Sequence, residues 1–137
     1  MPEKQHLYFI AIIPPEQICM EVTGFKEDFA NHFKSKAALK TKPHITLKAP
    51  FKFPALHHKE TIQWFEQMPI TVLSFQQKLN DFDAFHNKRN PVIYVKPVIN
   101  PSLSLLQKQV LLNFKEKYPH ENIMELEFTY KPHMTIA

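Results

Sequence analysis

The amino-acid sequence predicts an α+β domain of two similar lobes, related by a pseudo-twofold axis, with outer helices on antiparallel sheets and a central cleft. Two observations carry this prediction. A peptide is repeated, since TKPHITLK at residues 41–48 returns as YKPHMTIA at residues 130–137. The apolar pattern before each copy also follows one order, a strand and then a helix. A chain of 137 residues suffices for one domain, residues 1–137, but not for two independent cores.

The first half predicts a strand, a helix and a second strand. Residues 7–13, LYFIAII, form an apolar run of strand length. Pro14 and Pro15 follow, and proline suits the first turn of a helix because that turn does not use its amide hydrogen. A strand over residues 38–47 is then expected to carry the first copy of the repeat. The helix is predicted by apolar residues at helical spacing, namely Ile18, Val22, Phe25, Phe29 and Phe33.

The second half predicts the same order. Alternating apolar residues over 92–98 indicate a strand. Asn100 and Pro101 resemble the cap and the first-turn proline of a helix. A strand over residues 126–136 is expected to carry the second copy of the repeat. The helix has its own apolar stripe, which consists of Leu103, Leu106, Val110 and Phe114.

Between the halves we expect one helix and two strands. The helix covers residues 59–68, and the first strand covers residues 70–79. A second strand is expected around residues 82–85. Residues 86–90, HNKRN, then suit the loop of a hairpin that leads into the strand at residue 92.

Composition and charge exclude several classes of function. With a single glycine, Gly24, the chain cannot form the glycine-rich phosphate loops of Walker or dinucleotide-binding motifs. A net charge of +4 from scattered residues permits an anionic ligand but does not predict a long nucleic-acid track, and we expect no DNA partner. No spacing of histidine, cysteine or carboxylate residues matches a known metal motif, so we expect neither a metal nor a cofactor.

The same features indicate where the protein resides. Cys19 is the only cysteine, which excludes an intrachain disulfide and favours a reducing compartment. The apolar run at residues 7–13 is too short for a membrane span. We therefore expect a cytoplasmic monomer without a membrane partner.

The repeated His-x-Thr peptide has a chemical meaning if it lies on a strand. Alternate side chains of a strand share one face, so His44 and Thr46 point one way while their neighbours point the other. The same holds for His133 and Thr135. Pro43 and its counterpart in the second copy lack an amide hydrogen, which suits an edge or the start of a strand. Two imidazoles and two hydroxyls that met across a cleft could clamp one phosphate group.

At these residues the sequence resembles the two-histidine (2H) phosphoesterase superfamily, which includes bacterial 2′-5′ RNA ligase-like proteins and cyclic phosphodiesterases. KPHITL and KPHMTI match its paired His-x-Thr motifs, and the resemblance covers essentially the whole chain. One such motif would carry no signal, but two with similar flanks about ninety residues apart are specific for the superfamily. Members usually continue beyond the second motif, so we expect this chain, which ends at Ala137, to lack an outer strand or helix.

The resemblance implies metal-independent chemistry on a 2′,3′-cyclic phosphate, a 2′-5′-linked nucleotide or an RNA end. His44 and His133 would be the acid–base pair, with Thr46 and Thr135 as ligands of the phosphate oxygens. Imidazole suits this role because its reference pKa lies near 6.5. The sequence leaves open which histidine is the base, and whether hydrolysis or ligation occurs in the cell.

Further residues are candidates for substrate binding. Tyr8 on the first strand is expected to face the cleft. Phe51 and Phe53 are expected to pack in the core or to line the cleft wall, and the alternative is that they stack on a base. Lys48 either approaches a phosphate or lies in solvent. The same two alternatives apply to Lys88 and Arg89.

Three functions remain open. The first is a phosphodiesterase or ligase-like enzyme, and two complete motifs favour it because each supplies a proton-transfer group. The second is a non-catalytic nucleotide- or RNA-binding module that keeps the same clamp. The third, an acyl-transfer hydrolase that uses Cys19, lacks a histidine or asparagine in a suitable context.

Overall fold

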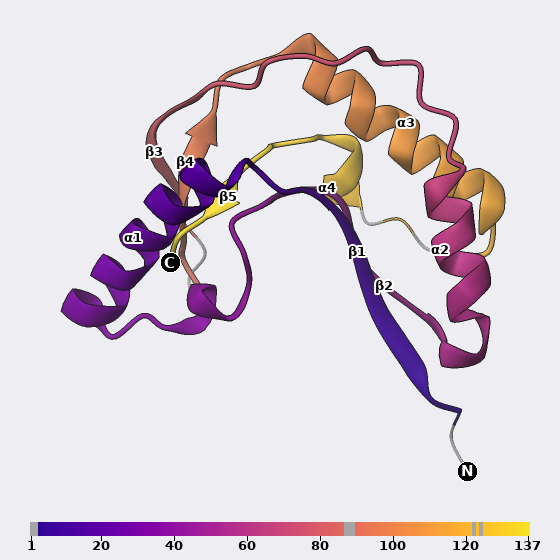
Figure 1. The fold of residues 1–137 in the computed structure, drawn as a ribbon, viewed down its shortest axis with the longest axis horizontal. Helices are drawn as coiled ribbons and strands as arrows, with labels where there is room; N and C mark the ends of the chain where they lie inside the picture. The colour runs from indigo at the N-terminus through magenta and orange to yellow at the C-terminus, as the bar shows by residue number, and fades with distance from the viewer. Residues whose placement is uncertain (1–2, 87–89, 122, 124) are drawn as a thin grey trace. The chain divides into compact units, whose positions relative to one another are not determined.

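The computed structural model describes residues 3–86, 90–121, 123 and 125–137, and it has an α+β fold (Figure 1). Two strands form one sheet, in the order β1–β2, and three form another, in the order β3–β4–β5. No helix among these residues is both long enough and apolar enough to cross a membrane. The elements are β1 (Gln5–Ile12), α1 (Glu16–Phe33), η1 (Ala37–Lys40), β2 (Ile45–Pro54), η2 (Ala55–His57), α2 (His58–Glu66), β3 (Leu79–Phe85), β4 (Val92–Pro97), α3 (Pro101–Lys117), α4 (Glu125–Phe128) and β5 (Met134–Thr135).

The chain divides into two compact units, and each unit contains segments from both halves of the sequence. The two sequence halves therefore do not correspond to the two units. Unit 1 consists of Met1–Ile10, Leu47–Phe75 and Asn100–Tyr130, and unit 2 consists of Ala11–Thr46, Gln76–Ile99 and Lys131–Ala137.

Unit 1 is built around an aromatic core on α3. Phe114 of α3 has no exposed surface, and its ring lies 4.9 Å from that of Phe51 on β2, between ring centroids. Trp64 of α2 meets the Phe114 ring edge-on, with 6.2 Å between ring centroids. The sequence predicts the start of α3 correctly, because the side chain of Asn100 accepts a hydrogen bond from the Ser102 amide at 3.0 Å.

Unit 2 contains the three-stranded antiparallel sheet and α1. β4 lies in the middle, with Tyr94 opposite Asp83 of β3 and Thr135 of β5. The ring of Phe25 on α1 meets that of Phe82 on β3 edge-on, with 5.3 Å between ring centroids. The hairpin expected before residue 92 is confirmed, although residues 87–89 of its loop lie outside the described part of the chain.

The predicted core stripe of α1 is only partly right. Val22 is buried, but Phe33 at the end of the helix is 71% exposed. The buried row instead continues through Lys26 and Ala30, at a spacing of four residues. The buried face of α1 is therefore offset from the predicted apolar stripe and shares Val22 with it.

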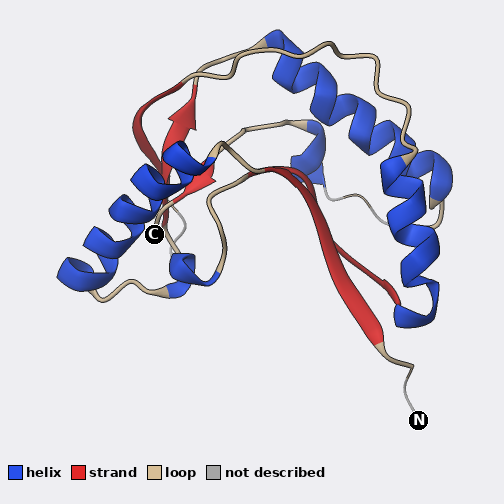
Figure 2. Cartoon of the chain, in the orientation of Figure 1, coloured by secondary structure: helices blue, strands red, loops and turns tan. Residues whose placement is uncertain are grey.

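The strand predicted over residues 70–79 is wrong. Residues 67–78 connect α2 to β3 without regular structure (Figure 2), and the strand begins only at Leu79. The Thr71 amide donates to the side chain of Gln109 on α3 at 3.0 Å, where a strand would bond to another strand. Leu73, in the middle of the predicted strand, is 86% exposed.

The strands predicted to carry the repeat begin later than expected. Most of residues 38–47 form η1 and an extended segment, and β2 begins at Ile45 and continues to Pro54. Within residues 126–136 the chain first forms α4, and only Met134 and Thr135 belong to β5. Each strand begins two residues after a proline, which cannot donate to a ladder.

Candidate functional site

Unit 2 contains both His-x-Thr peptides. His44 directly precedes β2 and His133 directly precedes β5. The predicted alternation is confirmed, because these histidines and threonines are all half-buried while their neighbours are in the core. The buried neighbours are Ile45 at 3%, Leu47 at 6%, Met134 at 1% and Ile136 at 1% exposure.

The two histidines have the same local contact. Nδ1 of His44 lies 2.8 Å from the carbonyl oxygen of Lys42, and Nδ1 of His133 lies 2.9 Å from that of Lys131. The cause lies in the repeated Lys-Pro-His sequence. Proline restricts the preceding residue to extended conformations and fixes its own φ, so both lysine carbonyls are presented to the histidine two residues later.

This contact determines which ring nitrogen can exchange a proton. A carbonyl oxygen only accepts hydrogen bonds, so Nδ1 must carry a proton in His44 and in His133. The neutral form of each imidazole then has its lone pair on Nε2. Both rings are therefore held in the tautomer in which Nε2 can accept a proton and, once protonated, return it.

The second histidine is packed against the sheet of unit 2. Its ring meets Phe85 of β3 edge-on, with 4.9 Å between centroids, and lies 5.5 Å from the ring of Tyr94 on β4. The backbone beyond it is paired as well, since the Ile136 amide donates to the Ile93 carbonyl at 2.9 Å. The position of His133 thus depends on β3 and β4, which are distant in sequence.

Phe85 and Tyr94 are site residues that sequence reasoning missed. Alternation over residues 92–98 places Tyr94 opposite to Val95, yet both are 7% exposed because the central strand is covered on two faces. Burial, and then the negative charge of Asp83, raise the pKa of Tyr94, so its hydroxyl stays neutral beside His133. The available signal was the pair of aromatic residues close to the predicted hairpin, Phe85 at the end of β3 and Tyr94 at the third position of β4.

The first motif is tied to α1 through a buried lysine. The ammonium group of Lys26, 2% exposed, donates to the Thr41 carbonyl at 2.8 Å. Burial lowers the pKa of Lys26, and the nearby Cys19 partly offsets this shift. An open hollow of about 900 Å³ lies between α1 and residues 39–43, and these residues directly precede His44 in the sequence.

Two further candidates lie in unit 1. The Tyr8 hydroxyl is 2.7 Å from Nδ1 of His58 and 3.4 Å from Nδ1 of His6. Its ring stacks on that of Phe51, with 5.6 Å between centroids and 21° between planes. Phe51 is 8% exposed and contacts Phe114, so it packs in the core of this unit, the first of its two alternatives.

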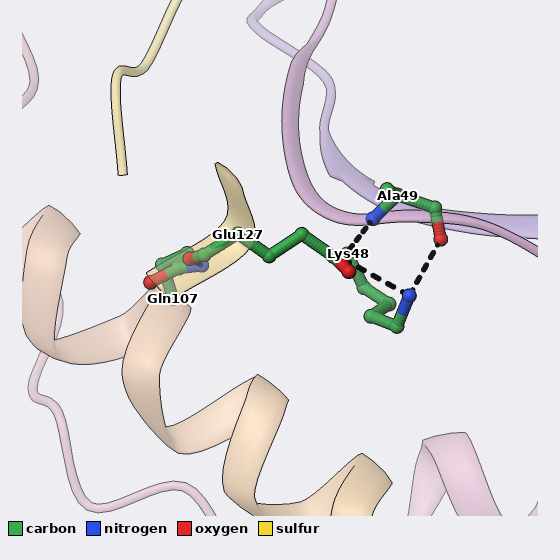
Figure 3. Close-up of polar contacts among 4 residues, drawn as sticks. All are labelled: Lys48, Ala49, Gln107 and Glu127. Carbon is green, nitrogen blue, oxygen red and sulfur yellow. Dashed lines mark hydrogen bonds and ion pairs between the residues drawn. The ribbon is translucent and has the colours of Figure 1, made fainter. Parts of the chain in front are cut away.

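Lys48 is buried, which contradicts the alternative that places it in solvent. Its ammonium group lies 3.0 Å from a carboxylate oxygen of Glu127 and donates to the Ala49 carbonyl at 2.9 Å (Figure 3). The Ala49 amide donates to the same carboxylate at 2.9 Å, and the Gln107 side chain donates to the Glu127 carbonyl at 2.8 Å. The ammonium group also lies over the Phe114 ring, 4.6 Å from its centroid, so Lys48 forms an ion pair inside unit 1.

The structure does not bear on two other basic candidates. Lys88 and Arg89 lie outside the described residues. Within the part of the chain that is described, no three or more histidine, cysteine, aspartate or glutamate side chains form a group that could hold a metal ion.

Comparison with known proteins gives consistent matches over most of the chain. The family model of the 2′-5′ RNA ligase superfamily matches residues 14–137. A protein of Geobacillus kaustophilus (strain HTA426), named "Putative phosphoesterase GK0864", is 30% identical over 134 residues, which are 95% of this chain and 68% of the relative. One of Bacillus cytotoxicus, "Putative phosphoesterase Bcer98_0945", is 28% identical over 128 residues, with 93% and 67% covered.

A solved structure supports the fold. The crystal structure of TT0787 of Thermus thermophilus matches with a TM-score of 0.65 and 18% sequence identity. The match covers 94% of this chain and 71% of that chain. At this identity the likeness establishes a shared fold, in agreement with the α+β fold expected from the sequence.

Proposed function

Because the chain belongs to the 2′-5′ RNA ligase superfamily, we propose that it is a phosphoesterase that acts on 2′,3′-cyclic phosphates or on 2′-5′-linked nucleotides or RNA. Its relatives in Geobacillus kaustophilus and Bacillus cytotoxicus carry phosphoesterase names, which support the general reaction. The residues proposed for it are His44, His133, Thr46 and Thr135.

One observation carries the proposal, namely that both imidazoles donate from Nδ1 to a lysine carbonyl. A purely structural repeat does not need the same tautomer in two separate peptides. A pair of proton-transfer groups does, because each must present the same nitrogen to substrate.

The reaction follows from these two nitrogens. Nε2 of one neutral histidine accepts a proton from water as the water oxygen forms a bond to phosphorus. The bond from phosphorus to one ribose oxygen breaks, and that oxygen receives the proton from Nε2 of the other, protonated histidine. The two histidines exchange protonation states in each turnover and return to the start by exchange with solvent.

The threonines and the ribose define the substrate. The hydroxyls of Thr46 and Thr135 donate hydrogen bonds to phosphoryl oxygens as negative charge develops on them. A cyclic phosphate of this type requires a ribose 2′-oxygen, so RNA and ribonucleotides qualify and DNA does not. We place this reaction in the cytoplasm, as the single cysteine favours.

The test combines a substrate screen with matched variants. Purified protein is incubated with 2′,3′-cyclic nucleotides, 2′-5′-linked dinucleotides and RNA with a cyclic-phosphate end, and product position is assigned by phosphorus NMR. His44→Ala and His133→Ala should each lower turnover by about 10² to 10⁴-fold. His32→Ala is the control, since His32 in unit 2 also bonds through Nδ1 to a carbonyl, that of Asp28, but lies exposed on α1.

The outcomes separate the candidate functions. Full activity in a folded His133→Ala protein contradicts the two-histidine mechanism. Nucleotide binding without turnover of any phosphoester would favour the binding module.

We also expect activity to survive EDTA, because two imidazoles suffice for both proton transfers. Protein treated with EDTA is assayed on the best substrate from the screen, beside untreated protein. A loss of activity that one added divalent metal restores would contradict this mechanism.

A further inference from the structure

Three side chains in unit 1 bring potential metal ligands together outside the proposed catalytic residues. His6 and Tyr8 are two residues apart on β1 and so share one face of the strand. His58 is the first residue of α2. The contacts of His58 with His6 and Tyr8 place the start of this helix beside one face of β1.

The three donor atoms form a small triangle. Nδ1 of His6 lies 3.3 Å from Nδ1 of His58, and the Tyr8 hydroxyl lies 2.7 Å from Nδ1 of His58 and 3.4 Å from Nδ1 of His6. An imidazole nitrogen holds its lone pair or proton in the ring plane. Hydrogen bonding among these atoms therefore means that they face one another.

These distances suit a shared metal ion. For four ligands at about 2.1 Å around Zn²⁺, neighbouring donor atoms lie roughly 3.4 Å apart. The three measured separations are within 0.7 Å of that value and two are within 0.1 Å. We propose that Nδ1 of His6, the phenol oxygen of Tyr8 and Nδ1 of His58 bind one Zn²⁺ ion, with water as the fourth ligand.

Contacts around the cluster hold the Tyr8 ring and the start of β1 in place and leave the site accessible to solvent. The Tyr8 ring stacks on buried Phe51, and the Ala55 amide bonds to the Lys4 carbonyl at 2.9 Å, which joins the end of β2 to the start of β1. His58 is exposed, so a water ligand can reach the metal from solvent.

Binding replaces hydrogen bonds by coordination bonds. In the metal-free protein the Tyr8 hydroxyl can donate to His58 and accept from His6, so the three groups satisfy one another. A phenol binds zinc as phenolate and imidazole binds as the neutral ring, so Zn²⁺ displaces the Tyr8 proton into solvent. Affinity should therefore rise with pH more steeply in the wild type than in a Tyr8→Phe protein.

The test uses tag-free protein with Co²⁺ as a coloured substitute for Zn²⁺. Titration of the wild type should show one bound Co²⁺ with the strong visible absorption of a four-coordinate ion, and Zn²⁺ should abolish it. His6→Gln, His58→Gln and Tyr8→Phe should each weaken binding by about tenfold or more. His57→Ala is the matched control, because His57 adjoins His58 in sequence but pairs with Glu60 instead, at 3.7 Å.

Each result decides one part of the proposal. Absence of Co²⁺ and Zn²⁺ binding by the wild type overturns it, as does equal weakening in His57→Ala and His58→Gln. Unchanged affinity in Tyr8→Phe overturns the phenol as a ligand. As a measure that does not rely on colour, Zn²⁺ should raise the melting midpoint of the wild type and of His57→Ala by similar amounts, and that of His58→Gln by less. Phosphoesterase activity is expected to survive EDTA whether or not this zinc site exists, because none of its three ligands is among the residues proposed for the reaction.

Discussion

A proline placed before each candidate histidine has a chemical consequence. It forces the lysine before it into an extended conformation and aims that lysine's carbonyl at Nδ1 of the histidine. The three-residue sequence Lys-Pro-His therefore determines the imidazole tautomer through a local hydrogen bond.

The threonines allow a sharper test than removal of either histidine. A hydrogen bond to a charged group contributes about 1.5–3 kcal/mol, so Thr46→Val and Thr135→Val should each lower turnover by about 10- to 100-fold. Thr46→Ser and Thr135→Ser keep the hydroxyl and should retain most of the activity. Steady-state kinetics of the four variants checks this, and equal losses in the valine and serine proteins would show that the hydroxyl is not the relevant group.

The two histidines should also fail to act independently. If one accepts and the other donates a proton in the same step, the double variant His44→Ala/His133→Ala loses much less than the product of the single losses. Single-turnover rates of the three proteins provide the measurement. Losses that multiply would mean that the two residues act in separate steps.

At the scale of elements, the Lys48–Glu127 pair joins α4 to β2, while Gln107 joins it to α3. All three side chains are at most 8% exposed. Taking two charges out of water is costly, so such a pair adds little stability overall, yet removing one partner leaves a buried charge. Its role is to fix where α4 lies in unit 1.

This reasoning predicts an asymmetric double-mutant cycle. Glu127→Gln should cost about 3–5 kcal/mol, because it strands the ammonium group while still accepting from the Ala49 amide. Adding Lys48→Met should recover much of that loss. Urea unfolding of both single variants and the double variant measures the free energies of unfolding. A Glu127→Gln protein within about 0.5 kcal/mol of wild type would show that the pair is not buried in solution.

At the scale of the whole molecule, buried ionisable groups should make stability depend on alkaline pH. Burial raises the pKa of Tyr94, of Tyr118 and, most strongly, of Tyr130. A tyrosine with a raised pKa keeps its proton better folded than unfolded. Its contribution is complete below the unfolded pKa near 10 and is lost as pH rises through the folded pKa. Lys26, whose pKa is lowered, acts in the opposite sense.

We therefore predict that the free energy of unfolding falls as pH rises above about 10. Tyr130→Phe should flatten this fall, because phenylalanine has no proton to lose. Lys26→Met should steepen it, because it removes the group that gains stability as pH rises. Urea unfolding at several pH values measures the slopes, and the same slope in wild type and Tyr130→Phe would contradict the assignment to Tyr130.

Features that depend on local chemistry could be predicted from the sequence. The presence of α1, α2 and α3 follows from apolar spacing, and the start of α3 follows from its cap Asn100 and from Pro101. The burial of Ile45 and Met134 beside half-buried histidines follows from strand alternation. The choice of His44, His133, Thr46 and Thr135 came from a repeat that is visible in the sequence. The helices and the alternation depend on residues within a few positions of one another, and the repeat is found by comparing the two peptides directly.

The remaining features depend on tertiary contacts. These contacts placed both motifs in one unit, buried Lys48 against Glu127 from the far end of the chain, set Tyr94 against His133, and left residues 70–78 without a strand. The physical reason is the same in each case. Whether a lysine is solvated, a strand is paired or a tyrosine meets a histidine depends on partners that lie tens of residues away. Local pattern carries no information about which of those partners is near.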